Sequence, residues 1–216
     1  MTSRAQQGAD TRDRIIDAAV EVFTEKGFLG ASTREIAKRA GTNQGLITYH
    51  FGAKDDLWRA AADRIFEVLV ASLGEGLTSL DSSDPRERSR EGIRTFVRFS
   101  AAHPEFFRMM VDAGKAANER MEWLVDTHIK PRFEQFVDVG TGGIDPKLVP
   151  HAYYVMAGAA SLIFAVAPEC QRLTGLDPQV NDAIETHAEF VARLLIPLRA
   201  PAWSDVRACR IGRSKA

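Results

Sequence analysis

The most distinctive polar chemistry of this 216-residue sequence lies in one short stretch, residues 44–51. If this stretch is a helix, Ile47 and Phe51 lie one turn apart on its buried side. The residues that then face outward are Gln44, Gly45, Thr48 and Tyr49. Solvated helix faces normally carry lysine and glutamate. Amide and hydroxyl groups instead suit hydrogen bonding to base edges in the major groove of DNA, and a glycine allows close backbone approach.

The preceding residues predict a second short helix, over 33–40. Ser32 is placed to cap its N-terminus, and Glu35 completes a Ser-x-x-Glu capping box. Gly41 follows the helix, because glycine adopts the left-handed conformation of a C′ residue without a Cβ clash. One of two residues then caps the helix over 44–51, either Thr42 or Asn43. Two short helices joined by a glycine turn are typical of a helix-turn-helix, although an ordinary αα-hairpin has the same spacing.

From Thr11 to about Trp58, roughly a quarter of the chain, the sequence resembles the DNA-binding domain of TetR-family transcriptional regulators. The matching residues are Ile15, Ala18, Ala19, Phe23, Gly27, Thr33, Arg34, Ile36, Ala37, Ala40, Gly41, Tyr49, His50, Phe51, Lys54 and Leu57. The resemblance implies an all-α fold. An N-terminal three-helix helix-turn-helix domain (1–53, with 1–9 a flexible arm) is joined by a connecting helix to a C-terminal helical ligand-binding and dimerisation domain (54–200). Residues 201–216 are expected to form a frayed tail.

The resemblance also implies which residues contact a double-stranded DNA operator. Phosphate contacts fall to Thr33, Arg34 and Lys54, and base contacts to Gln44, Gly45 and Thr48. Tyr49 and His50 would contact the backbone or thymine methyl groups, and Asn43 completes the expected DNA-binding set. Many family members have Tyr where this chain has Thr48, so that contact is open. His50 fits equally well as a partly buried residue that supports the turn.

A small-molecule effector and a second copy of the chain are the other partners that the resemblance implies. The last two helices of such proteins form a four-helix bundle with their dimer mate, and the small residues 157–161 would allow close helix packing, although both helices could also complete the subunit's own core. The expected effector is mainly hydrophobic or aromatic. The candidate residues for its pocket, which fit an ordinary core as well, are Phe66, Phe107, Met110, Trp123, Tyr153, Tyr154 and Phe164.

Beyond the first three helices, apolar periodicity predicts an all-helical chain with no convincing strand. The first helix should run over about 10–26, and the connecting helix over about 54–73. The remaining helices are expected over about 86–102, 104–115, 118–138, 146–167 and 178–196. Pro131 should kink the helix over about 118–138 near Thr127, because proline removes one hydrogen-bond donor.

Composition sets further limits on the protein. Hydrophobic residues make up 45% of the chain, and the formal net charge is only −1. Through residue 55 there are eight Lys and Arg against seven Asp and Glu, so DNA binding must depend on local placement of charge. The two cysteines, Cys170 and Cys209, do not suggest a disulfide framework or a zinc site. We expect no apolar run of the roughly 18 residues that a membrane span needs, and no signal region precedes the first helix, so we expect a cytoplasmic protein without a membrane partner.

Catalytic signatures are missing from the sequence. The five histidines show no HExxH spacing, and there is no GxSxG, phosphate-binding glycine loop or CxxC pair. We therefore expect no enzyme activity, no catalytic residues, no metal and no cofactor. The favoured interpretation is a repressor that binds a palindromic operator as a homodimer and is released by its effector. The alternatives are a transcriptional activator and a helical ligand- or protein-binding module that does not bind DNA.

Overall fold

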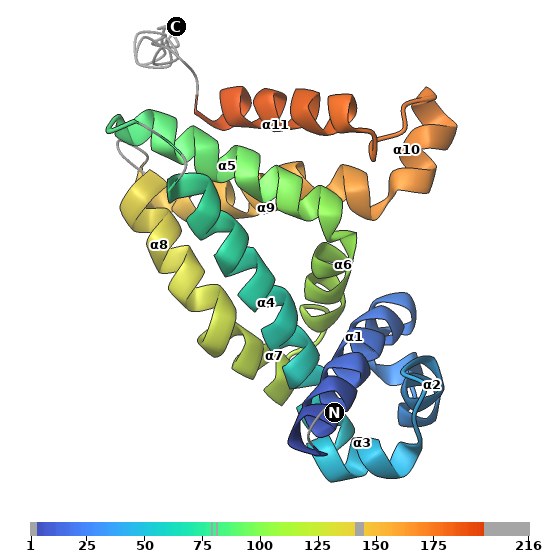
Figure 1. Ribbon diagram of the computed structural model, residues 1–216. Coiled ribbons are helices and arrows are strands. Elements are labelled where there is room, and N and C mark those ends of the chain that lie inside the picture. The colour runs from blue at the N-terminus through green and yellow to red at the C-terminus, as the bar shows by residue number, and fades with distance from the viewer. Residues whose placement is uncertain (1–3, 79, 81, 141–144, 197–216) are drawn as a thin grey trace, which may run out of the picture.

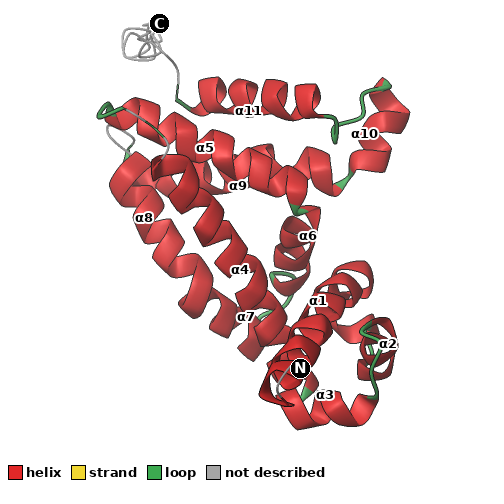
Figure 2. Cartoon of the chain, viewed as in Figure 1, coloured by secondary structure: helices red, strands yellow, loops and turns green. Residues whose placement is uncertain are grey.

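The computed structural model describes residues 4–78, 80, 82–140 and 145–196, and these residues form helices and no strands (Figures 1 and 2). The predicted all-α fold is confirmed. In chain order the helices are α1 (Arg4–Gly30), α2 (Thr33–Arg39), α3 (Gln44–Phe51), α4 (Lys54–Thr78), α5 (Pro85–Ala102), α6 (Pro104–Ala113), α7 (Glu119–Leu124), α8 (Lys130–Gly140), α9 (Val149–Ala165), α10 (Ala167–Thr174) and α11 (Asn181–Leu195), with a π-helical turn Val125–Ile129 before α8 and a 3₁₀ turn Pro146–Leu148 before α9.

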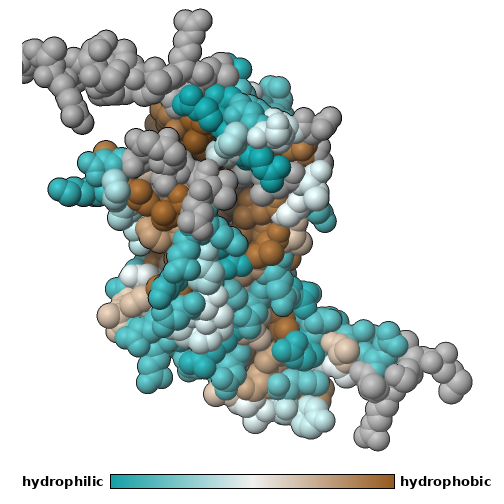
Figure 3. All heavy atoms as spheres, turned by 90° about the vertical axis from the view of Figure 1, so that its left-hand side faces the viewer, coloured by the Kyte–Doolittle hydropathy of each residue, from teal (hydrophilic) through white to brown (hydrophobic). Residues whose placement is uncertain are grey.

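The helices form a small N-terminal unit and a larger C-terminal one (Figure 1). Helices α1–α3 gather at one end, and α4 leads away from them to the far end of the molecule, with α8 beside it. There α5, α9 and α11 lie roughly side by side, and α6 connects this layer back to α1. Seen from the side of α8, hydrophobic residues gather over the C-terminal unit, whereas most of the surface nearer the N-terminal unit is hydrophilic (Figure 3).

One hydrophobic core runs through both units. It contains Phe23 of α1, Ile36 of α2, Ile47 of α3 and Leu57 of α4, each no more than 2% exposed. The same cluster continues to Met109 and other residues of the C-terminal half. Truncating one of these large side chains to alanine costs about 2–5 kcal/mol. The N-terminal unit is therefore anchored to the rest of the chain by burial as well as by the backbone at residue 53.

A second core holds α5, α9 and α11 together. Phe164 of α9 packs there with Val97 of α5 and Val191 of α11, and all three are about 1% exposed or less. Small residues let α5 and α9 approach closely, and the hydroxyls of Ser100 and Ser161 hydrogen-bond at 2.9 Å. Part of the stretch 157–161 thus completes the subunit's own core.

Helix α1 begins earlier than predicted. Residues 4–9, expected as a flexible arm, are helical, so Asp10 lies inside the helix instead of at its start. Alanine and glutamine favour helix in this segment, and the Thr11 hydroxyl donates to the Gln7 carbonyl at 2.8 Å. The predicted break at Gly27 is present as a kink, since Gly27 has a non-helical φ of 67°.

The later helices depart from prediction at three places. Helix α4 was expected to end at about residue 73 but continues through Gly74 and Gly76 to Thr78. Helix α10 was not predicted at all. Asp177 and Pro178 form a turn, in which the Asp177 carboxylate accepts from the Gln179 amide at 2.9 Å, so α11 starts at Asn181. The expected tail 201–216 lies outside the described residues.

Pro131 changes the helix in the predicted region. Instead of a simple kink, the turn before it widens into the π-helical segment Val125–Ile129, where the Lys130 amide donates to the Val125 carbonyl five residues back. A π turn lets the helix continue although proline has no N–H donor for the usual helical hydrogen bond. This π turn places the imidazole of His128 against α4, 2.7 Å from the Asp63 carboxylate.

The segment Pro146–Ala165 is a longer apolar segment than the sequence analysis predicts. It is 20 residues long with a mean hydropathy of 1.4, so length and composition alone would allow it to cross a membrane. A core helix of a water-soluble protein passes the same test. Here α9 packs against α5, α6 and α11, although only 22% of the window is buried.

Candidate functional site

Helix α2 begins where the sequence predicts. The Ser32 hydroxyl accepts from the Glu35 amide at 3.2 Å. The Glu35 carboxylate does not return the bond of a full capping box but pairs with Lys26 of α1 at 2.6 Å. Ile36 and Ala37 are buried against the core. The exposed start of α2 therefore keeps free backbone N–H groups, which favour a phosphate.

The turn between α2 and α3 has the geometry of a Schellman motif. Gly41 has a φ of 64°, and the Thr42 amide donates to the Ala37 carbonyl at 2.9 Å. Of the two candidate caps for α3, the structure selects Asn43, whose side-chain oxygen accepts from the Leu46 amide at 3.1 Å. Asn43 therefore has a structural role at the position where a DNA contact is expected.

The two faces of α3 separate as predicted. Ile47 is 2% and Phe51 is 9% exposed, whereas Tyr49 on the opposite side is 81% exposed. The other exposed residues of the outward face are Gln44, Gly45 and Thr48. None of these side chains is charged, so the face offers amide, hydroxyl and phenol groups to a partner.

Two expected DNA contacts touch each other across the turn. The Gln44 side-chain amide donates to the Thr33 hydroxyl at 3.0 Å, which joins the first residues of α2 and α3. His50 is half-buried, with its ring centroid 5.0 Å from that of Tyr49 and 6.2 Å from that of Phe51. This position suits either role expected of His50.

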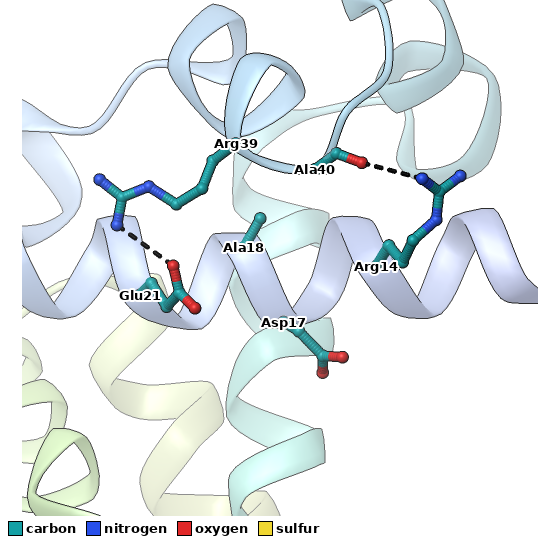
Figure 4. Close-up of a pocket in the computed structure, with 6 residues that line it drawn as sticks. All are labelled: Arg14, Asp17, Ala18, Glu21, Arg39 and Ala40. Atoms are coloured by element: carbon teal, nitrogen blue, oxygen red, sulfur yellow. Dashed lines mark hydrogen bonds and ion pairs between the residues drawn. The ribbon is translucent and has the colours of Figure 1, made fainter.

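Several arginines near this unit are engaged within it. Arg14 donates to the Ala40 carbonyl at 3.2 Å, and Arg39 pairs with Glu21 at 3.3 Å and with Glu25 at 2.7 Å (Figure 4). These contacts border a shallow pocket of about 180 Å³ between α1 and α2. The side chains that line it are Arg14, Asp17, Ala18, Glu21, Arg39 and Ala40. They fix α2 on α1, so these guanidinium groups are not free for phosphate.

Two cations of α2 are better placed for a phosphate backbone. Arg34 and Lys38 lie one turn apart, both are exposed, and neither forms an ion pair within the described part of the chain. Lys38 was absent from the predicted contacts, although its i, i+4 relation to Arg34 was visible in the sequence.

Lys54 lies where the N-terminal unit meets the C-terminal one. Its ammonium is 4.4 Å from the centroid of the Phe28 ring, and the Arg120 guanidinium lies 3.4 Å from the same centroid. Burial lowers the pKa of Lys54, and the nearby Arg120 lowers it further. Arg120 in turn pairs with Asp55 at 3.1 Å. The phosphate contact expected of Lys54 therefore requires its side chain to leave the Phe28 ring.

Asp112, at the end of α6, holds the kink near the end of α1. Its carboxylate accepts from the Phe28 amide at 3.2 Å. A Cβ on Gly27 would meet this carboxylate at 3.0 Å, so the close approach requires glycine as well as its positive φ. The C-terminal unit thus contacts the helix-turn-helix unit directly through α6.

Comparison with known proteins assigns this arrangement to a family. Residues 15–61 match the model of "Bacterial regulatory proteins, tetR family". Over 107 residues the chain is 35% identical to the HTH-type transcriptional repressor NicS of Pseudomonas putida, covering 50% of each chain. Over 103 residues it is 29% identical to the HTH-type transcriptional activator FasR of Mycolicibacterium smegmatis, covering 48% of this chain and 46% of FasR. The chain is a TetR-family protein.

The chain spans about half the length of these two relatives. The fold of this TetR-family chain is similar to that of AibR, which was solved in complex with isovaleryl coenzyme A and operator DNA. The TM-score is 0.66 at 17% identity, and the match covers 87% of this chain and 98% of AibR. These relatives are named as transcription regulators, which agrees with the prediction that the chain is not an enzyme.

In this TetR-family chain, three of the predicted effector residues lie on helices that surround one aromatic region. Phe66 of α4 is 3% exposed and stacks on His128 at 4.3 Å. Trp123 meets the His128 ring edge-on at 5.3 Å. Tyr153 of α9 faces α8, where its ring lies 5.2 Å from that of Phe133.

The other predicted effector residues are dispersed. Met110 packs at the edge of the first core, and Phe107 is half-buried on α6. Tyr154 is 74% exposed, and Phe164 belongs to the second core. The structure also adds Arg132 to the aromatic region, with its guanidinium carbon 5.1 Å from the Phe66 ring centroid. No sequence signal distinguished this arginine from those on solvated surfaces.

Proposed function

We propose that this protein is a ligand-responsive transcription regulator that binds a palindromic DNA operator as a homodimer. In the favoured form it is a cytoplasmic repressor, and a small hydrophobic or aromatic effector releases it from DNA. The observation that carries the proposal is the uncharged outward face of α3, opposite a face buried in the core.

The chemistry of α3 supports base reading more than solvation alone. An amide can hydrogen-bond twice to adenine, and hydroxyls can bond to several base edges. Exposed Arg34 and Lys38 on α2 and the N-terminus of α2 supply phosphate contacts on the same unit. The contacts of Gln44, Gly45, Thr48 and Tyr49 with bases and of Thr33 with phosphate are part of this proposal.

A face of α9 and α11 supports the homodimer. Large apolar side chains lie exposed on it, although such residues are normally buried. On α9 they are Tyr154 (74% exposed), Val155 (54%) and Leu162 (52%), and on α11 they are Phe190 (61%) and Leu194 (58%). Nothing lies within 4 Å of a Cβ placed on Gly158, so a second helix could approach there. A two-fold dimer through this face would pair two DNA-reading units for a palindrome.

Helix α4 offers the path from effector to DNA. Its first residue, Lys54, contacts the helix-turn-helix unit, and Phe66, three turns later, lies in the aromatic region. An effector beside Phe66 that favours another position of α4 would change the separation of the two reading units. To release DNA it must bind that state better than the DNA-bound state. AibR, which has a similar fold, was solved in complex with both isovaleryl coenzyme A and operator DNA.

Activation instead of repression fits the same contacts, and the matches include both a named repressor and a named activator. A binding module without DNA contacts is favoured by the net charge of −1 alone. The α3 face argues against it.

Selection of bound duplexes from a random pool, with purified protein at a stated salt concentration, tests the proposal. We expect a palindrome with half-sites about one helical turn apart to be enriched. A copurified ligand can hold the protein in its released state, so the selection is repeated after unfolding and refolding. No enrichment in either sample would contradict DNA reading and leave the binding module.

A further inference from the structure

Arg132 has guanidinium N–H groups for which the described residues provide no hydrogen-bond acceptor. Its Nη1 donates to the His128 carbonyl at 2.8 Å, whereas its buried Nε has no hydrogen-bond partner. In the described part of the chain no carboxylate pairs with Arg132, and nothing accepts from its Nη2. The Nε and Nη2 groups form the edge of a guanidinium that binds a carboxylate with two parallel hydrogen bonds.

The surroundings of Arg132 make an unpaired charge costly. The Arg132 side chain is half-buried and its Nε is fully buried, and this burial lowers its pKa. Arg98 of α5 provides the contrast, because its hydrogen bond to Glu185, at 2.8 Å, raises the pKa of that guanidinium. Arg90, Arg94 and Arg98 of α5 thus each have a carboxylate partner within the fold. An arginine without one, inside the expected effector region, is suited to an anion from outside.

Tyr153 places a second polar group against α8, the helix that carries Arg132, because its ring packs on Phe133, the residue after Arg132. Burial raises the pKa of Tyr153, and the positive charge of Arg132 opposes this rise. No hydrogen-bond partner for its hydroxyl occurs among the described residues. The phenol and the guanidinium come from different helices, α9 and α8, and the ring of Tyr153 is held by Phe133 at 5.2 Å and by Phe136 at 5.6 Å.

Aromatic rings supply the apolar part of the same region. The Arg132 guanidinium lies over Phe66, whose other contacts include the stacked His128 ring and the Phe106 ring at 5.3 Å. The π turn before Pro131 is what brings His128 against α4. A ligand with an anionic head and an apolar body would match both parts of this surface.

We propose that Arg132 binds the carboxylate of the effector, that the Tyr153 hydroxyl donates to the same carboxylate, and that the apolar body of this acid lies against Phe66. The inference rests on the proposed function, because it names the chemical class of that function's effector. Carboxylate binding itself is measured without DNA, so each proposal can fail separately.

The test compares acids with alcohols of the same skeleton. The probes are octanoate against 1-octanol and 4-phenylbutyrate against 4-phenyl-1-butanol, titrated into the full-length protein by calorimetry and by tryptophan fluorescence, since Trp123 lies in the region. We expect at least one acid to bind at least tenfold more tightly than its alcohol. In Arg132→Gln that preference should disappear, with the acid weakened tenfold or more and the alcohol changed little. Tyr153→Phe should weaken the acid several-fold.

Arg59 provides a matched control. Its Nε is also buried without a partner, and its guanidinium lies 5.5 Å from the Trp123 ring centroid, but on α4. Arg59→Gln should leave the preference for acid intact. If Arg132→Gln unfolds, Arg132→Lys keeps the charge but loses the two-bond edge and should give an intermediate affinity.

Equal affinity of acid and alcohol for the wild-type protein would overturn the proposal. So would the absence of binding by both acids, or a loss of acid binding in Arg59→Gln with none in the Arg132 variants. If an acid binds through Arg132 but no DNA sequence is ever selected, the carboxylate site stands and the regulatory function fails.

Discussion

The side-chain amide of Gln44 donates to the hydroxyl of Thr33 at 3.0 Å, so the first residues of the two helix-turn-helix helices are joined by a hydrogen bond. An exposed glutamine has several rotamers, and ordering one costs free energy. The bond to Thr33 reduces this cost and leaves the amide oxygen and the second N–H hydrogen for a base. The proposed base reading by Gln44 is therefore coupled to the position of α2.

Arg34 and Lys38 are expected to set the salt dependence of DNA binding. Removing one phosphate contact reduces the magnitude of the slope of log K against log salt by about 0.9. Arg34→Gln and Lys38→Gln should each lower the slope by about one and weaken all sequences alike, as measured by fluorescence anisotropy at several salt concentrations. Arg39→Gln is the comparison, because Arg39 is engaged by Glu25 and Glu21. An unchanged slope for both α2 variants would remove them from the interface.

The exposed face of α9 and α11 predicts the site of self-association. Leu162→Glu would place a carboxylate in the centre of the proposed dimer interface, and burying an unpaired charge is strongly unfavourable. We expect sedimentation equilibrium to give a monomer for Leu162→Glu and a dimer for the wild type. The control is Leu173→Glu, since Leu173 is 78% exposed but lies on α10. If Leu162→Glu remains a dimer of wild-type stability, another face must mediate association.

Asp112 is predicted to stabilise the contact between α6 and the end of α1. Asp112→Ala removes the acceptor of the Phe28 amide and should cost about 1 kcal/mol. Asp112→Asn keeps a carbonyl oxygen there and should lose less. Hydrogen exchange of residues 27–30 locates the effect, with faster exchange expected only in Asp112→Ala. Equal exchange rates in all three proteins would show that the bond contributes nothing to the kink.

The ion pairs between α5 and α11 predict a loss of stability in acid. The hydrogen bond from Arg98 lowers the pKa of Glu185 below its ordinary value of 4.5. A lowered folded-state pKa contributes stability that is present above the unfolded value and lost as pH falls through the folded value. The melting-temperature difference between wild type and Arg98→Gln should therefore be largest near neutral pH and shrink below about pH 4.5. A difference independent of pH would assign the effect to packing of the arginine instead.

Sequence information was sufficient where a structure is determined by near neighbours. Ser32, Gly41 and Asn43 act through backbone groups two to five residues away, so the boundaries of α2 and α3 were predicted closely. The two faces of α3 followed from the spacing of Ile47 and Phe51. The family resemblance added roles for these positions that spacing alone left open.

Predictions were less accurate where packing between segments distant in the sequence determines the structure. Asp145 and Asp177 both precede proline, and each caps a short turn, so α9 starts at Val149 and α11 at Asn181 instead of at the prolines. Helix α10 has no buried residue among those described, so it left no apolar stripe in the sequence. Arg132 depends on what surrounds it in three dimensions, and no spacing in the sequence indicates a missing carboxylate.

The most direct test of base reading by α3 measures the affinity of the selected operator and of its single-base variants for three proteins. These are the wild type, Gln44→Ala and Thr33→Val. We predict that Gln44→Ala loses discrimination at one base pair per half-site, worth about 1–3 kcal/mol, and keeps it elsewhere. Thr33→Val should lose part of the discrimination at that same base pair, whereas Thr33→Ser retains it. A uniform weakening at every position in Gln44→Ala, with base preferences unchanged, would contradict the account.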